Sequence, residues 1–291
     1  MSLNPAQLAY SSKFYDLPLI ALQGDSAKSW ISRGANFVVT VTTVNSGDVL
    51  CRDNSDEYVL IIPDAIGLSA SIQAGEFNQV AAHDSLSIIP PGQSRIDFTG
   101  SGLVVRVFSS DAIDLIHLAE NSNHYIVPNP DIAPLIAWPD PIDGFKIRYY
   151  KLSDYSKGDS NMRVFRTAKL MINPLLKRVV PRDITKLSPH QHTDFEQGSL
   201  AISGIYVHHM RYPWGPDLNF WHADEAIEVK SPSLQIIPPK VLHTSRNVGD
   251  EHGYLIDIFA PPRVDFTLKN MVCNASEYPL PQELVDNKIR L

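Results

Sequence analysis

The stretch Ser85–Arg95, which reads SLSIIPPGQSR, recurs as SLQIIPPKVLH at Ser233–His243. Ser, Leu, Ile, Ile, Pro and Pro stand at matching places, and the two copies begin about half of the 291-residue chain apart. A common turn signature that arises twice explains this spacing less well than a duplication does. Because single cores stop growing at roughly 250–300 residues, the repeat predicts two homologous domains.

Short runs of β-branched and aromatic residues alternate with Gly, Pro, Asn, Asp and Ser along most of the chain. This pattern is typical of many short strands joined by turns. The clearest runs are NFVVTVTTV, EYVLIIP, GLVVRVF, SLQIIPP and GYLIDIF. Helical periodicity is confined to Asp111–Glu120 and Pro281–Arg290. The sequence therefore predicts an all-β core with a few peripheral helices.

The segment Asn121–Phe145 contains five prolines in 25 residues. Each proline lacks a backbone donor, so this density interrupts both β-ladders and helices. We therefore expect the connection between the two domains at residues 121–145. The first domain then covers residues 1–120 and the second covers residues 146–291.

The charge of the chain excludes some partners. The formal net charge is -7, and there is no run of Lys and Arg that would attract a phosphate backbone or an anionic bilayer. We expect neither nucleic acid nor a membrane as a partner, since no apolar run approaches the roughly 20 residues of a membrane span. Cys51 and Cys273 are too few for a disulfide framework. A cytoplasmic protein is expected.

Two histidines, His190 and His192, stand two residues apart in the second half. On a strand their imidazoles would project from the same face, which is one way to present two nitrogen ligands to a metal ion. His243 directly follows the repeated Ile-Ile-Pro-Pro turn and can supply a third imidazole. An oxygen from Glu196 or Gln197 can fix a fourth position and leave one or two open.

These motifs resemble those of the cupin superfamily, whose members are double-stranded β-helix (jelly-roll) barrels; two such barrels in tandem make a bicupin. The first cupin motif is H-x-H, then three or four residues, an acidic residue, six further residues and Gly. In this chain His190 and His192 form the H-x-H pair, TDFEQ and GSLAIS follow, and Gly204 stands at the final glycine. The second motif is P-x-G, two residues, His, three residues and Asn. It fits Pro238 to Asn247, except that Lys240 replaces the glycine.

The resemblance leaves the oxygen ligand open. Three residues separate Glu196 from His192, whereas six residues separate Gln197 from Gly204, and four separate Gln197 from His192. Neighbouring strand residues point to opposite faces, so only one of the two can face the ion. The turn glycine favours Gln197, with Glu196 as the alternative ligand or a partner that orients a histidine. A neutral Gln197 amide in place of a Glu196 carboxylate would leave the metal centre more positive by one charge.

The segment Ile205–Val229 lies between the two motifs and is rich in aromatic, basic and imidazole side chains. In a barrel such a segment supplies strands and a loop near the mouth, where substrate selectivity is set. The candidates for the substrate pocket are Tyr206, His208, Arg211 and Trp221. Arg211 could pair with a substrate carboxylate through its planar guanidinium.

The first half has lost the metal motif. Cys51, Asp53 and Glu57 stand at the first-motif positions, and Arg95 stands where His243 stands in the second copy. An arginine cannot ligate a metal ion. We therefore expect a degenerate site in which the Arg95 guanidinium takes the place of the ion and pairs with Asp53 or Glu57.

The resemblance implies one divalent metal ion per chain, with Fe(II) favoured and Mn, Ni, Zn or Co as alternatives. It favours a dioxygenase that acts on a small aromatic or enolisable substrate in the second barrel. The alternatives are a cupin isomerase or decarboxylase at the same metal, or a bicupin that binds a small ligand without turnover. Jelly rolls often pair through exposed sheet edges, so a homodimer is expected.

Overall fold

The computed structural model describes residues 6–63, 65–156, 160–250 and 252–283. Its strands form four sheets, and all neighbouring strands in them run antiparallel. The first half carries a seven-stranded sheet, in the order β12 (Arg148–Lys151), β9 (Ser85–Ile89), β6 (Tyr58–Ile62), β11 (Gly102–Ser109), β4 (Phe37–Val44), β3 (Lys28–Arg33) and β2 (Ile20–Ala21). Its smaller sheet has the order β5 (Val49–Asn54), β10 (Gly92–Thr99), β7 (Ser69–Ala74) and β8 (Phe77–Ala82).

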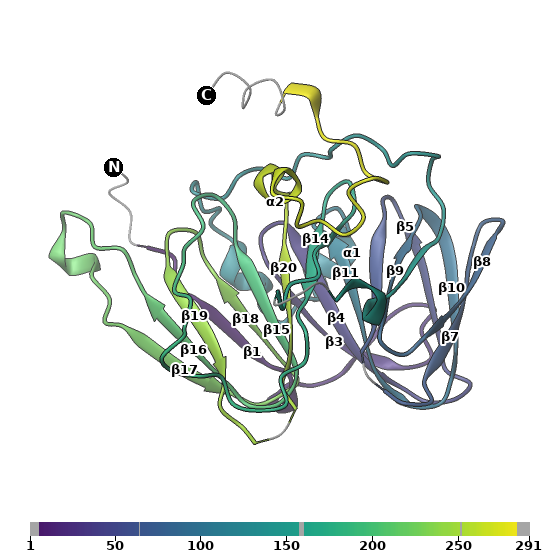
Figure 1. The fold of residues 1–291 in the computed structure, drawn as a ribbon, viewed down its shortest axis with the longest axis horizontal. Helices are drawn as coiled ribbons and strands as arrows, with labels where there is room; N and C mark the ends of the chain where they lie inside the picture. The colour runs from purple at the N-terminus through teal and green to yellow at the C-terminus, as the bar shows by residue number, and fades with distance from the viewer. Residues whose placement is uncertain (1–5, 64, 157–159, 251, 284–291) are drawn as a thin grey trace.

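The second half repeats this arrangement. Its larger sheet has the order β1 (Tyr10–Lys13), β18 (Ser233–Ile237), β15 (Gln197–Ser203), β20 (Tyr254–Phe259), β14 (Met171–Pro174) and β13 (Phe165–Arg166). Its smaller sheet contains β17 (Glu225–Val229), β16 (Tyr206–Arg211) and β19 (Leu242–Asn247). A large and a small sheet packed face to face make one jelly-roll barrel in each half (Figure 1). The predicted all-β fold of two tandem barrels is confirmed.

The helices are short and peripheral, as predicted. The α-helices are α1 (Ile113–Leu118) and α2 (Val264–Leu268), and the 3-10 helices are η1 (Phe14–Asp16), η2 (Ser122–Tyr125), η3 (Leu152–Tyr155) and η4 (Leu218–Phe220). The predicted helix at Asp111–Glu120 is α1. Most of the predicted helix at Pro281–Arg290 lies outside the described residues. No helix in the described ranges has the length and apolar character needed to cross a bilayer.

The two larger sheets face each other and share one hydrophobic core. Val59 and Ile61 on β6 lie in this core with Leu200 on β15 and Ile258 on β20, all almost completely buried. Because side chains alternate along a strand, the intervening residues of β6, Tyr58, Leu60 and Ile62, face the interior of their own barrel. Each central strand therefore has one face toward the other barrel and one face toward its own interior.

Each half lends a strand to the sheet of the other. The N-terminal β1 pairs with β18, and Lys13 lies opposite Ser233. In the same way β12, from the second half, pairs with β9, and Lys151 lies opposite Ser85. Figure 1 shows the purple β1 among the green strands of the second barrel. The predicted boundaries at residues 120 and 145 stay predictions; no helix or strand occurs between Tyr125 and Arg148.

Candidate metal centre

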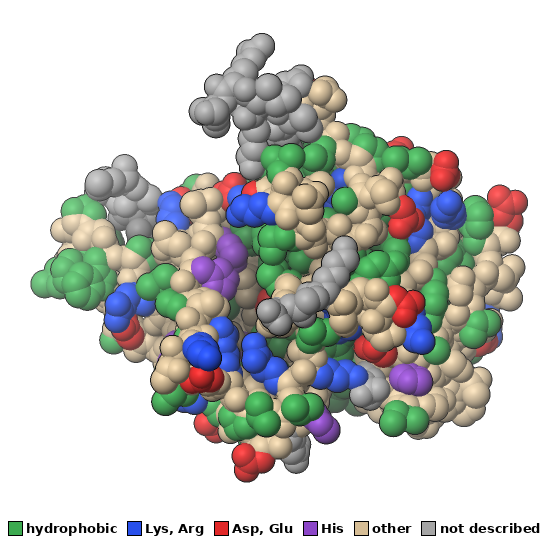
Figure 2. Space-filling view, in the orientation of Figure 1, with side chains coloured by type: hydrophobic (Ala, Val, Ile, Leu, Met, Phe, Trp, Pro, Cys, Tyr) green, Lys and Arg blue, Asp and Glu red, His purple; other side chains and the backbone are tan. Residues whose placement is uncertain are grey.

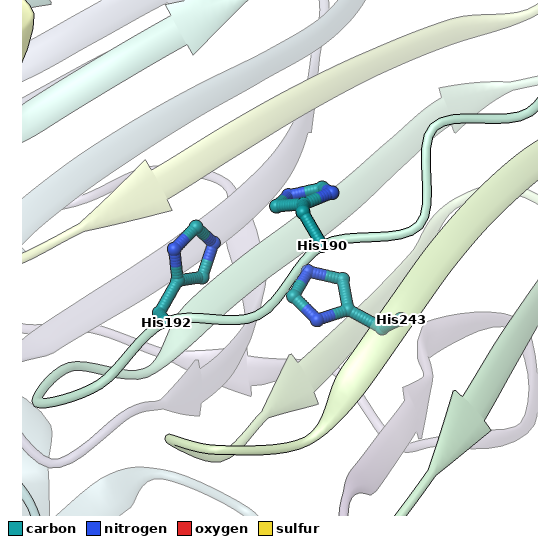
Figure 3. Close-up of side chains that lie close together, drawn as sticks. All are labelled: His190, His192 and His243. Carbon is teal, nitrogen blue, oxygen red and sulfur yellow. The ribbon is translucent and has the colours of Figure 1, made fainter.

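Three imidazoles meet in the second barrel. His190 and His192 lie on the segment that leads into β15, and His243 lies on β19 (Figure 3). One ring nitrogen from each lies within 4.8 Å of the others. The centroids of the His190 and His243 rings are 4.4 Å apart, and those of His192 and His243 are 5.3 Å apart. The three predicted nitrogen ligands are therefore close enough to share one ion.

The backbone around the histidines differs from the expected strand. His190 forms an isolated bridge with His243, in which the His190 N–H donates to His243 O at 3.0 Å and the His243 N–H donates to His190 O at 2.8 Å. Residues 191–196 form no strand. The Lys240 N–H donates to His192 O at 2.6 Å, with φ of +66° at Lys240. Glycine adopts that conformation most easily, which explains the glycine of the cupin motif at this place.

Two backbone carbonyls set the tautomers of His190 and His243. His190 Nδ1 lies 2.9 Å from Ser188 O, and His243 Nδ1 lies 2.9 Å from Val241 O. A carbonyl only accepts, so Nδ1 carries the proton and Nε2 is left with a lone pair for a metal. Burial lowers the pKa of His192 to about 4 and that of His243 to about 3. Both rings are therefore neutral near pH 7, as metal ligands must be.

The structure separates Gln197 from Glu196. Gln197 Oε1 lies 2.8 Å from His192 Nε2 and 3.4 Å from His243 Nε2. Glu196 points to the opposite side, where its Oε2 accepts a hydrogen bond of 2.6 Å from the Ala35 N–H of the first barrel. The alternative in which Glu196 is the ligand or orients a histidine is therefore wrong, because adjacent residues at the start of β15 face opposite ways.

Asp257 and Ser199, which the sequence reasoning missed, hold the amide of Gln197. Gln197 Nε2 donates to Asp257 Oδ1 at 3.0 Å and to Ser199 Oγ at 2.9 Å. Burial raises the pKa of Asp257 to about 6. The alternation of β15 and β20 was the available signal, since Ser199 and Asp257 are register partners on the inner face.

The donor set fits a divalent ion. Three neutral imidazoles and one amide oxygen are ligands that suit Fe, Mn, Co, Ni or Zn. None of the four carries a negative charge, so a bound dication would keep its full charge. The nearest negative charge among the described residues is the buried Asp257 carboxylate, which holds the Gln197 amide and lines the adjoining cavity.

A cavity of about 420 Å³ adjoins the histidines. It is lined by His190, His243, Gln197, Tyr206, Arg178 and Arg182, among others. Neither arginine forms an ion pair with a carboxylate among the residues that the structure describes. Burial, and then the neighbouring Arg178, lower the pKa of Arg182. Arg178 precedes His190 by 12 positions and Arg182 precedes it by eight, in KRVVPRD, but the sequence does not show where their side chains point.

The predicted pocket residues divide into two groups. Tyr206 lines the cavity. His208 lies almost fully buried on the same inner face; its Nδ1 is 2.7 Å from Ser245 Oγ, and its Nε2 has no hydrogen-bond partner in the described residues. Arg211 and Trp221 are not among the residues that line this cavity, and Arg211 lines a different one with Gln191 and Leu242.

Arg211 and Trp221 belong to a projecting segment instead. Arg211 is exposed and pairs with Asp224 at 2.5 Å, because outward positions of β16 face water. Trp221 stacks on Trp214, with ring centroids 4.2 Å apart. Figure 2 shows hydrophobic side chains gathered at the left end of the molecule, where this segment projects. The segment carries the exposed Trp214, Leu218, Phe220 and Trp221.

The first barrel differs from the predicted degenerate site. The Arg95 side chain is 51% exposed and pairs with Asp97 at 2.6 Å, so its predicted pairing with Asp53 or Glu57 is wrong. Arg95 and Asp97 are two apart on β10 and share a face. Cys51 lies opposite Arg95 on β5, and Asp53 is exposed.

The buried guanidinium of the first barrel belongs to Arg106, which lies 2.5 Å from Asp25. Glu57 does not contact this pair, since it is buried between the barrels and accepts from the Tyr278 hydroxyl at 2.8 Å. Apolar side chains of β6, β7, β10 and β11 pack beside this pair, and a cavity of about 970 Å³ lined by Asp25, Arg106, Arg52 and Arg95, among others, lies in the first half. The second barrel differs, because it keeps Gln197, Ser199, Asp257 and the histidines in the same space.

The sequence matches no family model and no curated protein. Several solved structures are similar. A formate complex of oxalate decarboxylase from Lactobacillus farciminis has a TM-score of 0.58 and 11% identity, covering 99% of this chain and 95% of the other. An oxalate decarboxylase of Bacillus subtilis has a TM-score of 0.57 and 13% identity, covering 97% and 84%. AerE from Microcystis aeruginosa has a TM-score of 0.56 and 8% identity, covering 84% and 97%. The protein therefore has the bicupin fold, two tandem cupin barrels.

Proposed function

We propose that the second barrel is the active site of a metal-dependent cupin enzyme. His190, His192 and His243 would hold the metal through Nε2, and Gln197 through Oε1. The observation that carries the proposal is the convergence of these four neutral donors next to a polar cavity. Buried polar groups are costly unless paired, and the second barrel gathers three imidazoles, the Gln197 amide and the Asp257 carboxylate at one place, which favours a functional site there.

The cavity favours a small organic anion as substrate. Arg178 and Arg182 offer two guanidinium groups on the wall beside the histidines, and a planar guanidinium binds a carboxylate through two parallel hydrogen bonds. A volume of about 420 Å³ suits a small molecule. Arg178 and Arg182, rather than Arg211, would then pair with the carboxylate of the substrate.

Dioxygenation of a small aromatic or enolisable acid is the reaction that we favour. Four neutral donors leave positions for substrate and O2, and an anionic substrate would supply the missing negative charge. A bound Fe(II), or Mn, Co, Ni or Zn in its place, would supply a Lewis acid, and iron or manganese also a redox centre. Gln197 and the histidines hold the ion, and the arginines orient the acid.

Decarboxylation is the second candidate. The similarity of the whole chain to oxalate decarboxylases, one of them in complex with formate, favours it. The cavity residues also fit it, since a small dicarboxylate could bind the arginines at one end and the metal at the other.

Measurements on purified protein separate these outcomes. Metal analysis comes first, and a panel of small acids and diketones is then tested with O2 uptake and CO2 release recorded together. Oxygen consumption with substrate supports dioxygenation, and CO2 release without oxygen consumption supports decarboxylation. A substrate that changes into an isomer without either supports isomerisation. Stoichiometric ligand binding with no turnover supports the non-catalytic alternative and contradicts the enzyme.

We also propose that the chain works as a homodimer in the cytoplasm. Among the described strands, β8 and β17 each pair on one side only, and such edges are sites where barrels associate. Sedimentation velocity tests this assembly. A single species at the 32.4 kDa monomer mass would contradict it.

A further inference from the structure

Glu196 and Glu57 occupy matching places in the two barrels. Each directly precedes the central strand of a larger sheet, β15 or β6. The register confirms the match, because Gln197 lies opposite Ile237 and Tyr58 lies opposite Ile89, and these isoleucines are the same position of the repeat. Both glutamates are almost fully buried.

Each carboxylate binds the backbone of the other barrel. The Ala35 N–H, in the turn between β3 and β4, donates to Glu196 at 2.6 Å. The Ala168 N–H, in the turn between β13 and β14, donates to Glu57 at 3.4 Å. We call the contact of Glu196 with Ala35 and Tyr125 the Glu196 clamp, and the contact of Glu57 with Ala168 and Tyr278 the Glu57 clamp.

A tyrosine completes each clamp. The Tyr125 hydroxyl lies 3.3 Å from both carboxylate oxygens of Glu196, and the Tyr278 hydroxyl donates to Glu57 at 2.8 Å. The Arg33 guanidinium lies 4.6 Å from the Tyr125 centroid, and those of Arg148 and Arg166 lie 5.2 and 5.6 Å from the Tyr278 centroid. In the Glu196 clamp, Gln7 Nε2 also donates a hydrogen bond of 3.1 Å to Glu196 Oε1.

The two clamps differ in the next residue of the chain. Gln197 comes after Glu196 and faces the histidines, whereas Tyr58 comes after Glu57 and stacks on Phe108 inside the first barrel, with centroids 4.9 Å apart. Adjacent strand residues face opposite ways. Holding Glu196 against the first barrel therefore turns Gln197 toward the histidines.

We propose that Glu196 is a positioning residue for the metal centre. The first barrel, through the Ala35 N–H, fixes the backbone from which Gln197 presents its oxygen. This inference rests on the proposed metal site. It gives the first barrel a part in that site, although among the described residues the only group able to hold an ion is the histidine cluster of the second barrel.

Glutamine should replace Glu196 with little loss. Its side-chain oxygen can still accept from the Ala35 N–H, and its amide can donate to the Tyr125 hydroxyl, which both donates and accepts. Only the contact with Gln7 is lost, because two NH2 groups would then face each other. Alanine leaves the Ala35, Tyr125 and Gln7 donors without an acceptor. A positioning role thus predicts that Glu196→Gln rescues what Glu196→Ala loses.

The test is a titration of the full-length, metal-free protein with Co(II) alone, monitored by its visible absorption. We expect Glu196→Ala to weaken Co(II) binding about ten- to hundredfold, the usual effect of removing an outer partner of a ligand, and to change the absorption band. Glu196→Gln should bind within about threefold of the wild type on the same scale. Glu57→Ala is the matched control, since it breaks the equivalent clamp and should leave Co(II) binding unchanged.

Two results would overturn the proposal. Equal weakening by Glu196→Ala and Glu57→Ala would show that general packing between the barrels is responsible, and unchanged binding in Glu196→Ala would remove the positioning role. If Glu196→Ala does not fold, the milder pair Tyr125→Phe and Tyr278→Phe decides, with weaker Co(II) binding expected only for Tyr125→Phe. Failure of the metal site itself looks different: the wild type would then bind Co(II) no better than the His190→Ala, His243→Ala double variant.

Discussion

Gln197 Nε2 donates a hydrogen bond of 3.0 Å to Asp257 Oδ1, and this contact decides which end of the Gln197 amide faces the histidines. A carboxylate accepts but does not donate. The NH2 group is therefore held by Asp257, and Oε1 is presented to His192 at 2.8 Å. A buried acid thus orients a neutral ligand.

Asp257→Ala should lower metal affinity at least about tenfold, because the amide of Gln197 loses the acceptor that orients it. Asp257→Asn keeps an oxygen acceptor and should stay close to the wild type. Competition with a chromogenic chelator measures both. Equal losses in the two variants would show that the charge of Asp257 matters, rather than its hydrogen bond.

The double variant His190→Ala, His243→Ala should abolish metal binding, because one imidazole and one amide remain as donors. Elemental analysis of the purified protein measures bound metal per chain. His209→Ala is the control, since His209 contacts Arg246 on the outer face of β16. Unchanged metal content in the double variant would reject the site.

Arg178→Met should raise KM for an acidic substrate by roughly ten- to a hundredfold, the effect of losing one charge-assisted hydrogen bond, with a smaller change in kcat. Steady-state kinetics with the substrate found by the panel provide the measurement. Arg211→Met removes an exposed arginine that pairs with Asp224 and should leave KM unchanged. Similar effects of both substitutions would count against a substrate-binding wall.

Glu57 should make stability depend on pH. Burial raises its pKa from 4.5 to about 7, so between these values the folded protein holds a proton that the unfolded chain releases. The contribution of Glu57 is fully present below pH 4.5 and is lost as pH rises to 7, with a slope of up to about 1.4 kcal/mol per pH unit.

Urea unfolding of the wild type and of Glu57→Gln at several pH values measures this effect. The free energy of unfolding of the variant, relative to the wild type, should rise between pH 5 and 7 and then level off. Glu76→Gln, at an exposed glutamate, should behave like the wild type. Parallel curves for Glu57→Gln and the wild type would reject the raised pKa.

The repeat and the strand pattern predicted the fold well, because both depend on local chemistry. Each of the five runs named from the sequence lies on a strand, from β4 to β20. The three histidines were also found by spacing, since His243 comes directly after a turn present in both halves. Register explains the choice between Glu196 and Gln197, because the glycine at 204, with φ of +90°, ends the strand that contains Gln197.

Side-chain direction across long separations could not be read from the sequence. Arg95 matches His243 in the repeat, yet its side chain lies in solvent and pairs with Asp97. Arg106, on β11, points into the barrel instead. Arg211 stood near the motif but faced outward, whereas Arg178 and Arg182 reached the cavity from a segment without strands. Sequence spacing identifies faces within one strand, but it does not show which loop closes over a barrel mouth.

The exchange of β1 and β12 has a consequence for how such a chain can evolve. Neither half contains every strand of its own large sheet, so a gene cut between the halves would encode two fragments with open sheet edges at β18 and β9. Substitution of polar side chains inside the first barrel would leave every strand in place. Loss of the whole first half would remove β1 from the larger sheet of the second barrel, so the fold of the second barrel depends on the first.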